Sequence, residues 1–485
     1  MKLLDKSISN PIERPIRVVQ FGEGNFLRAF VDYMIDVANE KEYFNGSVVL
    51  LKPIEFGSLN LFREQECQYT VTLRGKQEGT ELISNRIITS VKDVVSIYEQ
   101  YDQYMELARL ETLRFIVSNT TEAGIVYDGM DKFDAKPPHT YPAKLTKFMY
   151  ERYETYKGRM DKGLIILPVE LIDDNGIVLK ECVLKYARLW ALEEEFITWL
   201  EEACIFCSTL VDRIVTGYPK EEALSICQQL GYEDKLLVTA EPFALWVIES
   251  EKEIKNELPL DKAGLPVIFT DNQSPYKQRK VRILNGAHTS FALASYLAGN
   301  DTVMESMQDA LIREFMNTVI FDEVIPTLTL AEEELITFAN SVIERFENPY
   351  INHELLSISL NSVSKWRTRC LPSLLEYVNI YRELPKNLVF SIAALMSFYS
   401  SSEFVDNYLM GNRNNKAYKI MDDQKILEFF AENHKLPTDK FVAAYLSNIS
   451  FHGQDLLQIP ELSERVTCYL ENIKALGIRK ALKML

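Results

Sequence analysis

Cysteine is scarce in this chain, and long apolar runs are missing from it. The seven cysteines in 485 residues are odd in number and thinly spread, which disfavours a disulfide framework. No stretch of about 18 apolar residues predicts a transmembrane helix, and residues 1–17 lack an apolar core of signal-peptide length. We therefore expect a cytoplasmic protein that has no membrane partner.

Positive charge is also in deficit. The 53 Lys and Arg residues face 70 Asp and Glu residues, a net charge of −17, so a broad surface for nucleic acid is not expected. The 47% of hydrophobic and 25% of charged residues are typical of a folded chain and exclude intrinsic disorder. At roughly 150 residues per domain, the length predicts two large domains or about three smaller ones.

The chain also lacks a set of Cys, His, Asp or Glu residues at the spacing typical of metal ligands. Cys204 and Cys207 form a CxxC pair, but no second pair or histidine follows at ligand spacing. We interpret them as two buried thiols. His139, His434 and His452 likewise have no partner at useful spacing. We therefore expect structural histidines and no metal.

The first half of the chain alternates between short apolar strands and helices. Apolar runs rich in β-branched residues predict strands at residues 16–21, 48–51, 114–118, 164–167 and 236–238. Helical spacing of apolar residues predicts helices at 26–39, 141–156 and 181–203. Strands that alternate with helices form βαβ units, so the pattern predicts the α/β class with a largely parallel sheet.

The second half is predicted to be mostly α-helical. Amphipathic runs occur at residues 302–319, 331–346, 388–399 and 423–433, and few strand patterns follow residue 275. Residues 261–275 carry the Gly, Pro, Asp and Asn of a connecting segment. We place the boundary there, with an α/β domain at 1–272 and a helical domain at 273–485.

A Gly-x-Gly pair separates the first predicted strand from the first predicted helix. Gly22 and Gly24 would let the backbone turn sharply and approach a pyrophosphate, and the following helix N-terminus would supply amide groups. The third glycine position of the dinucleotide-binding pattern holds Leu27, and Lys52 and Pro53 stand where an acidic ribose ligand usually follows the second strand. The alternative is an ordinary strand-to-helix turn.

A second polar loop follows the strand at 114–118. Asn119, Thr120 and Thr121 come directly after Ser118, at the carboxyl end of a strand, where open α/β sheets bind ligands. Their hydroxyl and amide groups suit the ribose of a cofactor. The alternative is a helix N-cap formed by Thr120 or Thr121 ahead of Glu122, and both interpretations hold together.

A lysine, an amide and an imidazole lie close together in the second half of the chain, at Lys280, Asn285 and His288. On an α-helix, Asn285 and His288 lie roughly 140° and 80° from Lys280, so the three share one broad face. Such a set suits redox chemistry of a carbonyl and an alcohol, because one group exchanges the hydroxyl proton while others polarise the oxygen. The alternative is a solvated basic face.

Cations then gather in an otherwise acidic chain. The group consists of Arg345, His353, Lys365, Arg367 and Arg369. Arginine grips a carboxylate with two parallel hydrogen bonds, so an anionic substrate is one explanation. An exposed helix face paired to glutamates is the other.

These segments together resemble the mannitol dehydrogenase family, the polyol-specific long-chain dehydrogenases and reductases. The matching pieces are residues 21–29, 118–122, 209–214, 276–288 and 345–349, in this order along the chain. Val211-Asp212-Arg213-Ile214 and Lys280-x4-Asn285-x2-His288 are specific in combination.

The resemblance implies a Rossmann-type N-terminal dinucleotide-binding domain, a helical C-terminal domain for substrate and catalysis, NAD as cofactor and no zinc. It implies Lys280 as the catalytic base, with Asn285 and His288 orienting and polarising the substrate oxygen, and Asp212 near the site. The expected cofactor-binding set is Phe21, Gly22, Gly24, Asn25, Phe26, Asn119, Thr120 and Thr121. The expected substrate-binding set is Asp212, Glu170, Arg345, His353, Lys365 and Arg369.

Within the family, residues 115–125, 168–176 and 206–219 are similar to the branch that interconverts D-tagaturonate and D-altronate in galacturonate catabolism. Leu171, next to Glu170, stands where mannitol and fructuronate members carry asparagine, which fits a different sugar acid. Fructuronate reduction and oxidation of a neutral polyol are the alternatives. The residues alone leave open the choice between NAD and NADP and the oligomeric state.

Overall fold

A computed structural model of the chain describes residues 1–121, 123–401 and 403–485. These residues form two compact units. The first comprises 1–75 and 81–273, and the second comprises 76–80 and 274–485. Each unit is described in turn.

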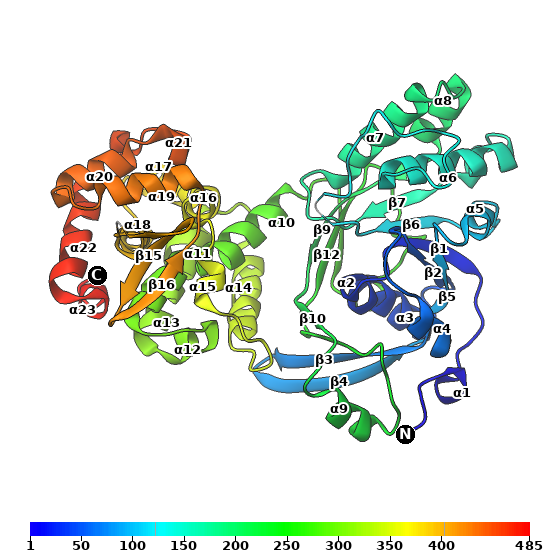
Figure 1. Cartoon of the computed structure of the whole chain (residues 1–485), viewed down its shortest axis with the longest axis horizontal. Coiled ribbons are helices and arrows are strands. Elements are labelled where there is room, and N and C mark those ends of the chain that lie inside the picture. The colour runs from blue at the N-terminus through cyan, green and yellow to red at the C-terminus, as the bar shows by residue number, and fades with distance from the viewer. Residues whose placement is uncertain (122, 402) are drawn as a thin grey trace. The chain divides into compact units, whose positions relative to one another are not determined.

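The first unit is built around a six-stranded parallel sheet of strand order β5-β2-β1-β6-β7-β8 (Figure 1). Its strands are β1 (Ile16–Phe21), β2 (Ser47–Lys52), β5 (Val91–Ser96), β6 (Phe115–Ser118), β7 (Ile165–Pro168) and β8 (Ile205–Phe206). Phe21 lies level with Leu51 on one side and with Ser118 on the other. The strand order reverses between β1 and β6, and such a reversal opens a crevice at the carboxyl ends. The predicted α/β class with a parallel sheet is confirmed.

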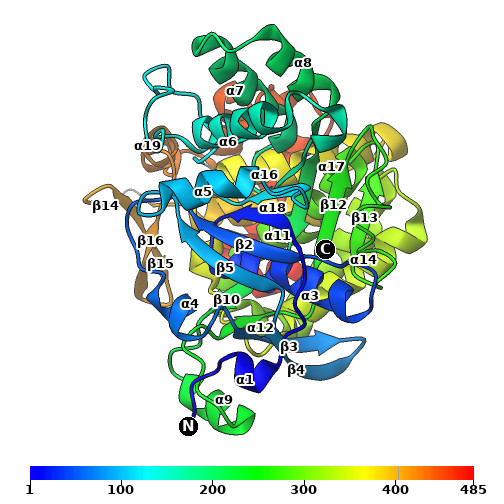
Figure 2. The same ribbon diagram turned by 90° about the vertical axis from the view of Figure 1, so that its right-hand side faces the viewer.

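Alternate residues of each strand feed two separate cores. Val18, Val48 and Phe115 face one core, whereas Val19, Val49 and Ile116 face the other. Helix α3 (Tyr33–Glu40) covers the first face. Helices α5 (Tyr101–Ala108), α6 (Tyr141–Tyr156), α7 (Asn175–Leu189) and α8 (Glu194–Glu202) cover the second. The alternation follows from the two-residue period of a strand, and it makes a three-layer unit. Figure 2 shows β2 and β5 side by side at the sheet edge.

Two smaller sheets complete the first unit. One has the order β10-β11-β3-β4, with β10 (Val215–Gly217), β11 (Val238–Ala240), β3 (Tyr69–Gln77) and β4 (Thr80–Ile88); the other has the order β13-β12-β9, with β13 (Val267–Thr270), β12 (Leu245–Glu249) and β9 (Ser208–Asp212). The remaining elements are α1 (Lys6–Ser9), α2 (Asn25–Leu27), the π-helical η1 (Arg28–Asp32), α4 (Asn60–Glu64), the 3₁₀ turn η2 (Met160–Lys162) and α9 (Ala223–Leu230). The helix predicted at 181–203 is instead two helices, α7 and α8.

The second unit is mostly helical, as predicted. Its helices are α10 (Ser274–Arg279), α11 (Gly286–Ala298), α12 (Val303–Gln308), α13 (Ala310–Thr318), α14 (Glu332–Phe346), α15 (Leu355–Ile358), α16 (Ser362–Arg369), α17 (Leu371–Tyr381), α18 (Lys386–Phe398), α19 (Gln424–Asn433), α20 (Thr438–Leu446), α21 (Ile449–His452), α22 (Leu462–Leu476) and α23 (Ile478–Leu482). Its π-helical segments are η3 (Lys280–Asn285) and η4 (Val319–Val324), and its 3₁₀ turns are η5 (Ile325–Thr327) and η6 (Leu456–Gln458).

Two features of the second unit differ from expectation. The run at 302–319 is broken at Asp309, whose extended backbone and side-chain bond to Leu311 N make it the N-cap of α13. A small antiparallel sheet, with β14 (Phe404–Val405), β15 (Tyr408–Arg413) and β16 (Lys416–Ile420), stands where few strands were expected.

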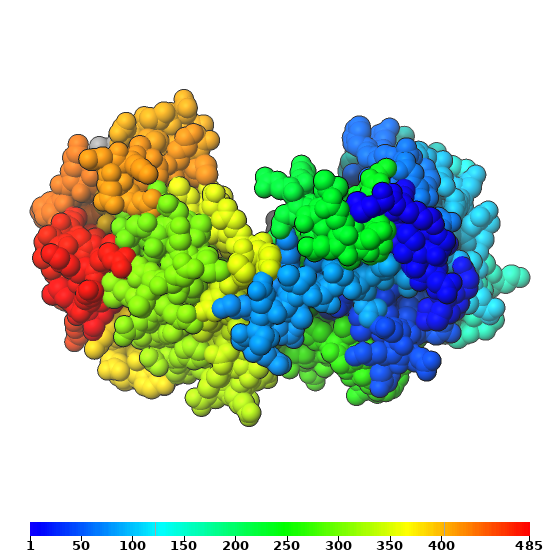
Figure 3. Space-filling view, turned by 90° about the horizontal axis from the view of Figure 1, so that it is seen from below, coloured from blue at the N-terminus to red at the C-terminus, as the bar shows by residue number. Residues whose placement is uncertain are grey.

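The tip of the β3–β4 hairpin, residues 76–80, belongs to the second unit. Lys76 Nζ lies 2.7 Å from Glu347 Oε2, and Gly79 N donates to Glu344 Oε1 at 2.7 Å. In Figure 3 the blue tip lies beside the yellow residues at the end of α14.

Candidate functional site

The glycine pair after β1 forms a tight turn. Gly22 has a φ of +126°, and a Cβ there would lie 3.0 Å from Leu27 Cδ1 and 3.2 Å from the Asn119 carbonyl oxygen. Only glycine fits this position. Gly24 is the N-cap of α2, with ordinary backbone angles and open space where a Cβ would stand. Gly22 therefore makes the turn, and Gly24 leaves the surface open to an approaching group.

Leu27 occupies the third glycine position without blocking this turn. Its side chain is buried and fills the space over Gly22. The chain then continues from α2 into the π-helical η1 and on into α3. The π-helical segment therefore begins directly after the residue that stands in place of the third glycine.

The loop after β6 is held in place by a buried carboxylate. Glu170, which follows β7, accepts hydrogen bonds at Oε1 from the Thr120 amide and from Thr120 Oγ1, both at 2.9 Å. Its Oε2 accepts from Ser118 Oγ at 3.1 Å. Burial raises the pKa of Glu170, and these bonds lower it. Glu170 therefore holds the polar loop in place at Ser118 and Thr120. Glu122, which was considered above as part of a helix N-cap, lies outside the described residues.

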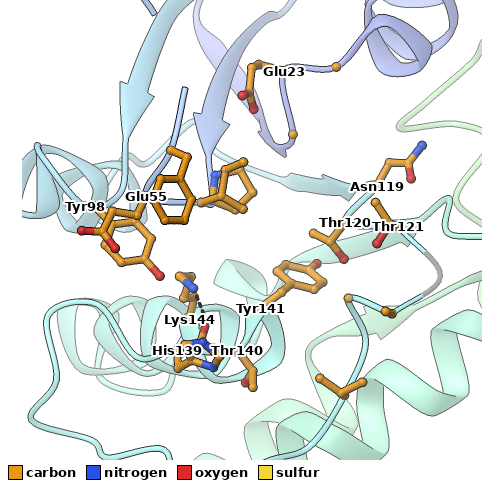
Figure 4. Close-up of a pocket in the computed structure, with 18 residues that line it drawn as sticks. Glu23, Glu55, Tyr98, Asn119, Thr120, Thr121, His139, Thr140, Tyr141 and Lys144 are labelled. Carbon is orange, nitrogen blue, oxygen red and sulfur yellow. Dashed lines mark hydrogen bonds between the residues drawn. The ribbon is translucent and has the colours of Figure 1, made fainter. Parts of the chain in front are cut away.

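The two loops line one cavity of about 590 Å³, a size typical of ligand sites (Figure 4). Asn119, Thr120 and Thr121 lie at one end, and Glu55, Tyr98 and Lys144 lie at the other. The lining residues are Gly22, Glu23, Gly24, Pro53, Ile54, Glu55, Phe56, Tyr98, Asn119, Thr120, Thr121, Ala123, Gly124, Val126, His139, Thr140, Tyr141 and Lys144.

The structure brings five of the eight predicted cofactor residues into this lining: Gly22, Gly24, Asn119, Thr120 and Thr121. The other three make structural contacts. Phe21 is fully buried beside the Tyr104, Tyr141 and Phe148 rings. Asn25 Oδ1 accepts from Arg28 at 2.5 Å, and Phe26 stacks on Phe30 at 5.0 Å.

Sequence reasoning missed the far end of the cavity. Tyr98 follows β5, a strand that was not predicted, and His139 was interpreted as structural. Lys144 is 2% exposed, its Nζ donates to the His139 carbonyl, and burial lowers its pKa to about 8. The signal for Glu55 was present, because it stands three residues after the second strand, close to where a ribose ligand is expected.

In the second unit, Lys280 and Asn285 are the first and last residues of the π-helical η3, and His288 lies in the first turn of α11. The angular spacing predicted for a continuous α-helix is therefore wrong, because π winding bonds residue i to i+5. Gly286 stands at the junction, where a Cβ would lie 3.3 Å from the Arg369 carbonyl oxygen. Glycine there lets the end of α16 approach η3.

His288 lies against aromatic rings. Its centroid is 4.2 Å from that of Phe346 and 5.0 Å from that of His353, which meets it edge-on. His288 Nε2 is shielded from solvent and has no hydrogen-bond partner among the described residues. Burial, and then the nearby charges of His353, Arg345, Arg369 and Lys365, hold the pKa of His288 well below its usual value. The imidazole is therefore neutral and offers one vacant polar atom.

Four predicted substrate residues thus gather around His288: Arg345, His353, Lys365 and Arg369. Lys365 Nζ donates to the Ile358 carbonyl at 3.0 Å, and Arg369 donates to Thr289 Oγ1 at 3.3 Å. Burial and Arg369 lower the pKa of Lys365 against the opposing charge of Asp422, and burial lowers the pKa of Arg369. Neither has a carboxylate within 4 Å in the part of the chain that the structure describes. The remaining two predicted residues, Glu170 and Asp212, belong to the first unit.

Several other features bear on the class of site. Cys204 and Cys207 are both buried free thiols, as predicted. Among residues 1–121, 123–401 and 403–485, no three His, Cys, Asp or Glu side chains are placed to hold a metal ion. Within the same ranges no helix has the length and apolar character needed to cross a membrane.

Comparison with known proteins gives consistent matches over the whole chain. A family model described as Mannitol dehydrogenase Rossmann domain matches residues 16–262, and one described as Mannitol dehydrogenase C-terminal domain matches residues 272–474. Curated proteins named altronate oxidoreductase from Escherichia coli O7:K1 (strain IAI39 / ExPEC) and from Shigella flexneri are each 46% identical over 492 residues, covering 100% of both chains.

Solved structures match in fold. Substrate-free D-sorbitol dehydrogenase has a TM-score of 0.81 at 19% identity, over 99% of this chain and 100% of that one. Pseudomonas fluorescens mannitol 2-dehydrogenase, in complex with NAD and D-mannitol, has a TM-score of 0.68 at 19% identity, over 100% and 99%.

Proposed function

The chain belongs to the mannitol dehydrogenase family, and from this premise we propose that it is an NAD-dependent oxidoreductase that interconverts D-tagaturonate and D-altronate. The relatives named altronate oxidoreductase, at 46% identity over their full length, support this substrate. The observation that carries the proposal is the set of cations around a neutral His288, in which Lys365 and Arg369 have no carboxylate within 4 Å among the described residues.

The nucleotide would bind in the cavity of the first unit. Gly22 and Gly24 leave the backbone open to a pyrophosphate, and α2 presents its N-terminus there. Thr120 and Asn119 offer hydroxyl and amide groups to a ribose. Glu55 favours NAD over NADP, because its carboxylate would accept from a ribose hydroxyl and repel a 2′-phosphate.

The second unit would supply the groups that act on the substrate oxygen. Bound NADH provides the hydride. Lys280 would give a proton to the substrate oxygen during ketone reduction, and in the reverse direction it would remove the proton of the hydroxyl group. Asn285 and the vacant Nε2 of His288 donate hydrogen bonds to the same oxygen, with His288 in the tautomer that carries hydrogen on Nε2. Because His288 is neutral and serves as a hydrogen-bond donor, the proton transfer is assigned to Lys280.

The substrate carboxylate would meet Lys365 and Arg369. The two cations lie one turn apart on α16, and like charges at this spacing destabilise a helix by about 0.2–0.5 kcal/mol. An anionic ligand removes that repulsion and forms charge-assisted hydrogen bonds to both groups. Arg345 and His353 add positive charge around the same ring.

A panel of substrates tests the proposal. NADH oxidation, followed by absorbance, should be fast with D-tagaturonate, slower with D-fructuronate, and slowest with the neutral ketose D-tagatose. Preference for D-fructuronate would move the chain to another branch of the family. Preference for the neutral ketose would remove the assigned role of the cations.

A further inference from the structure

A fully buried lysine ends β2. Lys52 is 1% exposed, and burying an ammonium group is costly unless its donors are bonded. Lys52 Nζ donates to the Gly57 carbonyl at 2.7 Å and to the Glu55 carbonyl at 3.2 Å, and it lies 3.5 Å from Glu99 Oε1. The three donors of this ammonium thus face three acceptors.

The two carbonyls belong to the loop 53–57, which lines the cavity of the first unit. The loop exposes large apolar side chains beside the cavity, with Ile54 at 56% and Phe56 at 78%. Exposed apolar groups next to a pocket mark a ligand surface. The third partner, Glu99, follows Tyr98, which lines the same end of the cavity (Figure 4). Lys52 therefore ties together two segments that shape one end of the pocket.

The structure also explains why the position after β2 is unusual. In dinucleotide-binding folds an acidic residue there accepts from the adenosine ribose. This chain has a lysine at that place, but the lysine is buried and bonded to the backbone carbonyls on both sides of Phe56. Glu55, exposed and lining the cavity, is the first acidic residue along the chain after the end of the strand.

We propose that Lys52 is a positioning residue: it holds the loop 53–57 so that Glu55 meets the adenosine ribose, and it thereby sets the preference for NAD over NADP. The proposal rests on the nucleotide site of the proposed function. It assigns the chemical contact to Glu55 and the shape of the loop to Lys52.

Nucleotide titrations of the full-length protein without sugar test it. NADH and NADPH dissociation constants are measured by fluorescence for the wild type, Glu55→Gln and Lys52→Met. Losing a hydrogen bond to a charged group costs about 1.5–3 kcal/mol, so Glu55→Gln should weaken NADH binding about tenfold or more and favour NADPH. Lys52→Met should lose the preference for NADH to a similar extent, although Glu55 is still present.

Two further variants keep the test decisive. Gly57 has a φ of +90° with open space at its Cβ position, so Gly57→Ala shifts the loop without a clash in the core. It should reduce the NADH preference in the same direction even if Lys52→Met fails to fold. Lys41 Nζ also donates to a backbone carbonyl, that of Ala263 at 2.7 Å, away from the cavity, so Lys41→Met should change neither constant.

An unchanged NADH-to-NADPH ratio in Lys52→Met or Gly57→Ala would overturn the positioning role, and an unchanged ratio in Glu55→Gln would overturn the contact. Failure of the proposed substrate would look different: no turnover with any sugar acid, while the nucleotide preference still follows these variants.

Discussion

At the level of single residues, the roles separate into groups that touch ligand and groups that hold others in place. Sequence patterns found Gly22, Gly24 and the threonine loop, because glycine conformation and strand ends are local features. They could not show that Phe21 is buried beside the Tyr104 and Phe148 rings, or that Glu170 bonds Thr120, because these contacts join residues far apart in the chain. Lys144 was missed for the same reason, since a lysine in a helical pattern is usually solvated.

Lys280 carries the proposed proton transfer. Lys280→Ala should lower kcat by about 10²–10⁴-fold, the usual contribution of a general acid or base, and leave the NADH dissociation constant unchanged. Steady-state kinetics with D-tagaturonate, together with NADH fluorescence titration, provide the measurement. Lys440→Ala removes one exposed lysine from α20 and controls for net charge. Wild-type turnover in Lys280→Ala would assign the proton to another group.

Lys144 predicts a pH dependence of cofactor binding. Burial lowers its pKa to about 8, so the amine is charged below that pH and neutral above it. Asp131 opposes the shift, and Tyr98 and Tyr141, whose pKa values are raised, stay neutral beside it. Anionic NADH favours the charged amine, so affinity should fall as pH rises through about 8.

A titration series from pH 7 to 9.5 measures this fall. Lys144→Met should bind NADH more weakly and show a flatter profile. Lys147 on the same helix is also partly buried, but its Nζ donates to the Ala135 carbonyl and it does not line the cavity. Lys147→Met should therefore keep the wild-type profile. A steep profile in Lys144→Met would place the titrating group elsewhere.

At the level of elements, local periodicity predicted that the segments carrying the site are helical, but it did not predict whether their winding is α or π. The run through Lys280 and His288 is helical, but η3 is π-helical, and nothing in its apolar spacing distinguishes i+5 from i+4 bonding. Helix α16 shows a complementary point. Its cations were visible in the sequence, whereas their approach to His288 depends on Gly286, which allows the end of α16 to lie against η3.

The two cations of α16, Lys365 and Arg369, are expected to bind the substrate carboxylate, and their mutual repulsion is expected to lower the stability of the helix. Arg369→Met should raise KM for D-tagaturonate about tenfold or more, through loss of a charge-assisted bond, with little change for D-tagatose. The ligand-free melting temperature should stay level or rise slightly, because a like-charge contact is removed. Arg367→Met alters an exposed residue of the same helix and should change neither quantity. An equal rise in KM in both variants would show that the effect comes from disturbance of α16 as a whole and not from the contact of Arg369 with the substrate.

At the level of the whole molecule, the alternation of strands and helices predicted the parallel sheet, and the shift to amphipathic helical runs predicted the helical C-terminal region. Strands β3, β4, β9, β12 and β13 were not predicted, because their partners lie far along the chain and short mixed runs carry little signal of their own. The same limit hid the membership of residues 76–80 in the second unit. The net charge of −17 is a property of the whole chain, whereas binding of the proposed anionic substrate depends on the local group of cations around His288.

Identification of the product is the measurement to make first on the wild-type protein. D-Tagaturonate and NADH are incubated with the enzyme, and the mixture is resolved by chromatography and NMR. One mole of D-altronate should form for each mole of NADH oxidised. Formation of the epimer at the reduced carbon would show that the assigned reaction is wrong, and so would turnover of D-fructuronate in a parallel reaction while D-tagaturonate stays intact.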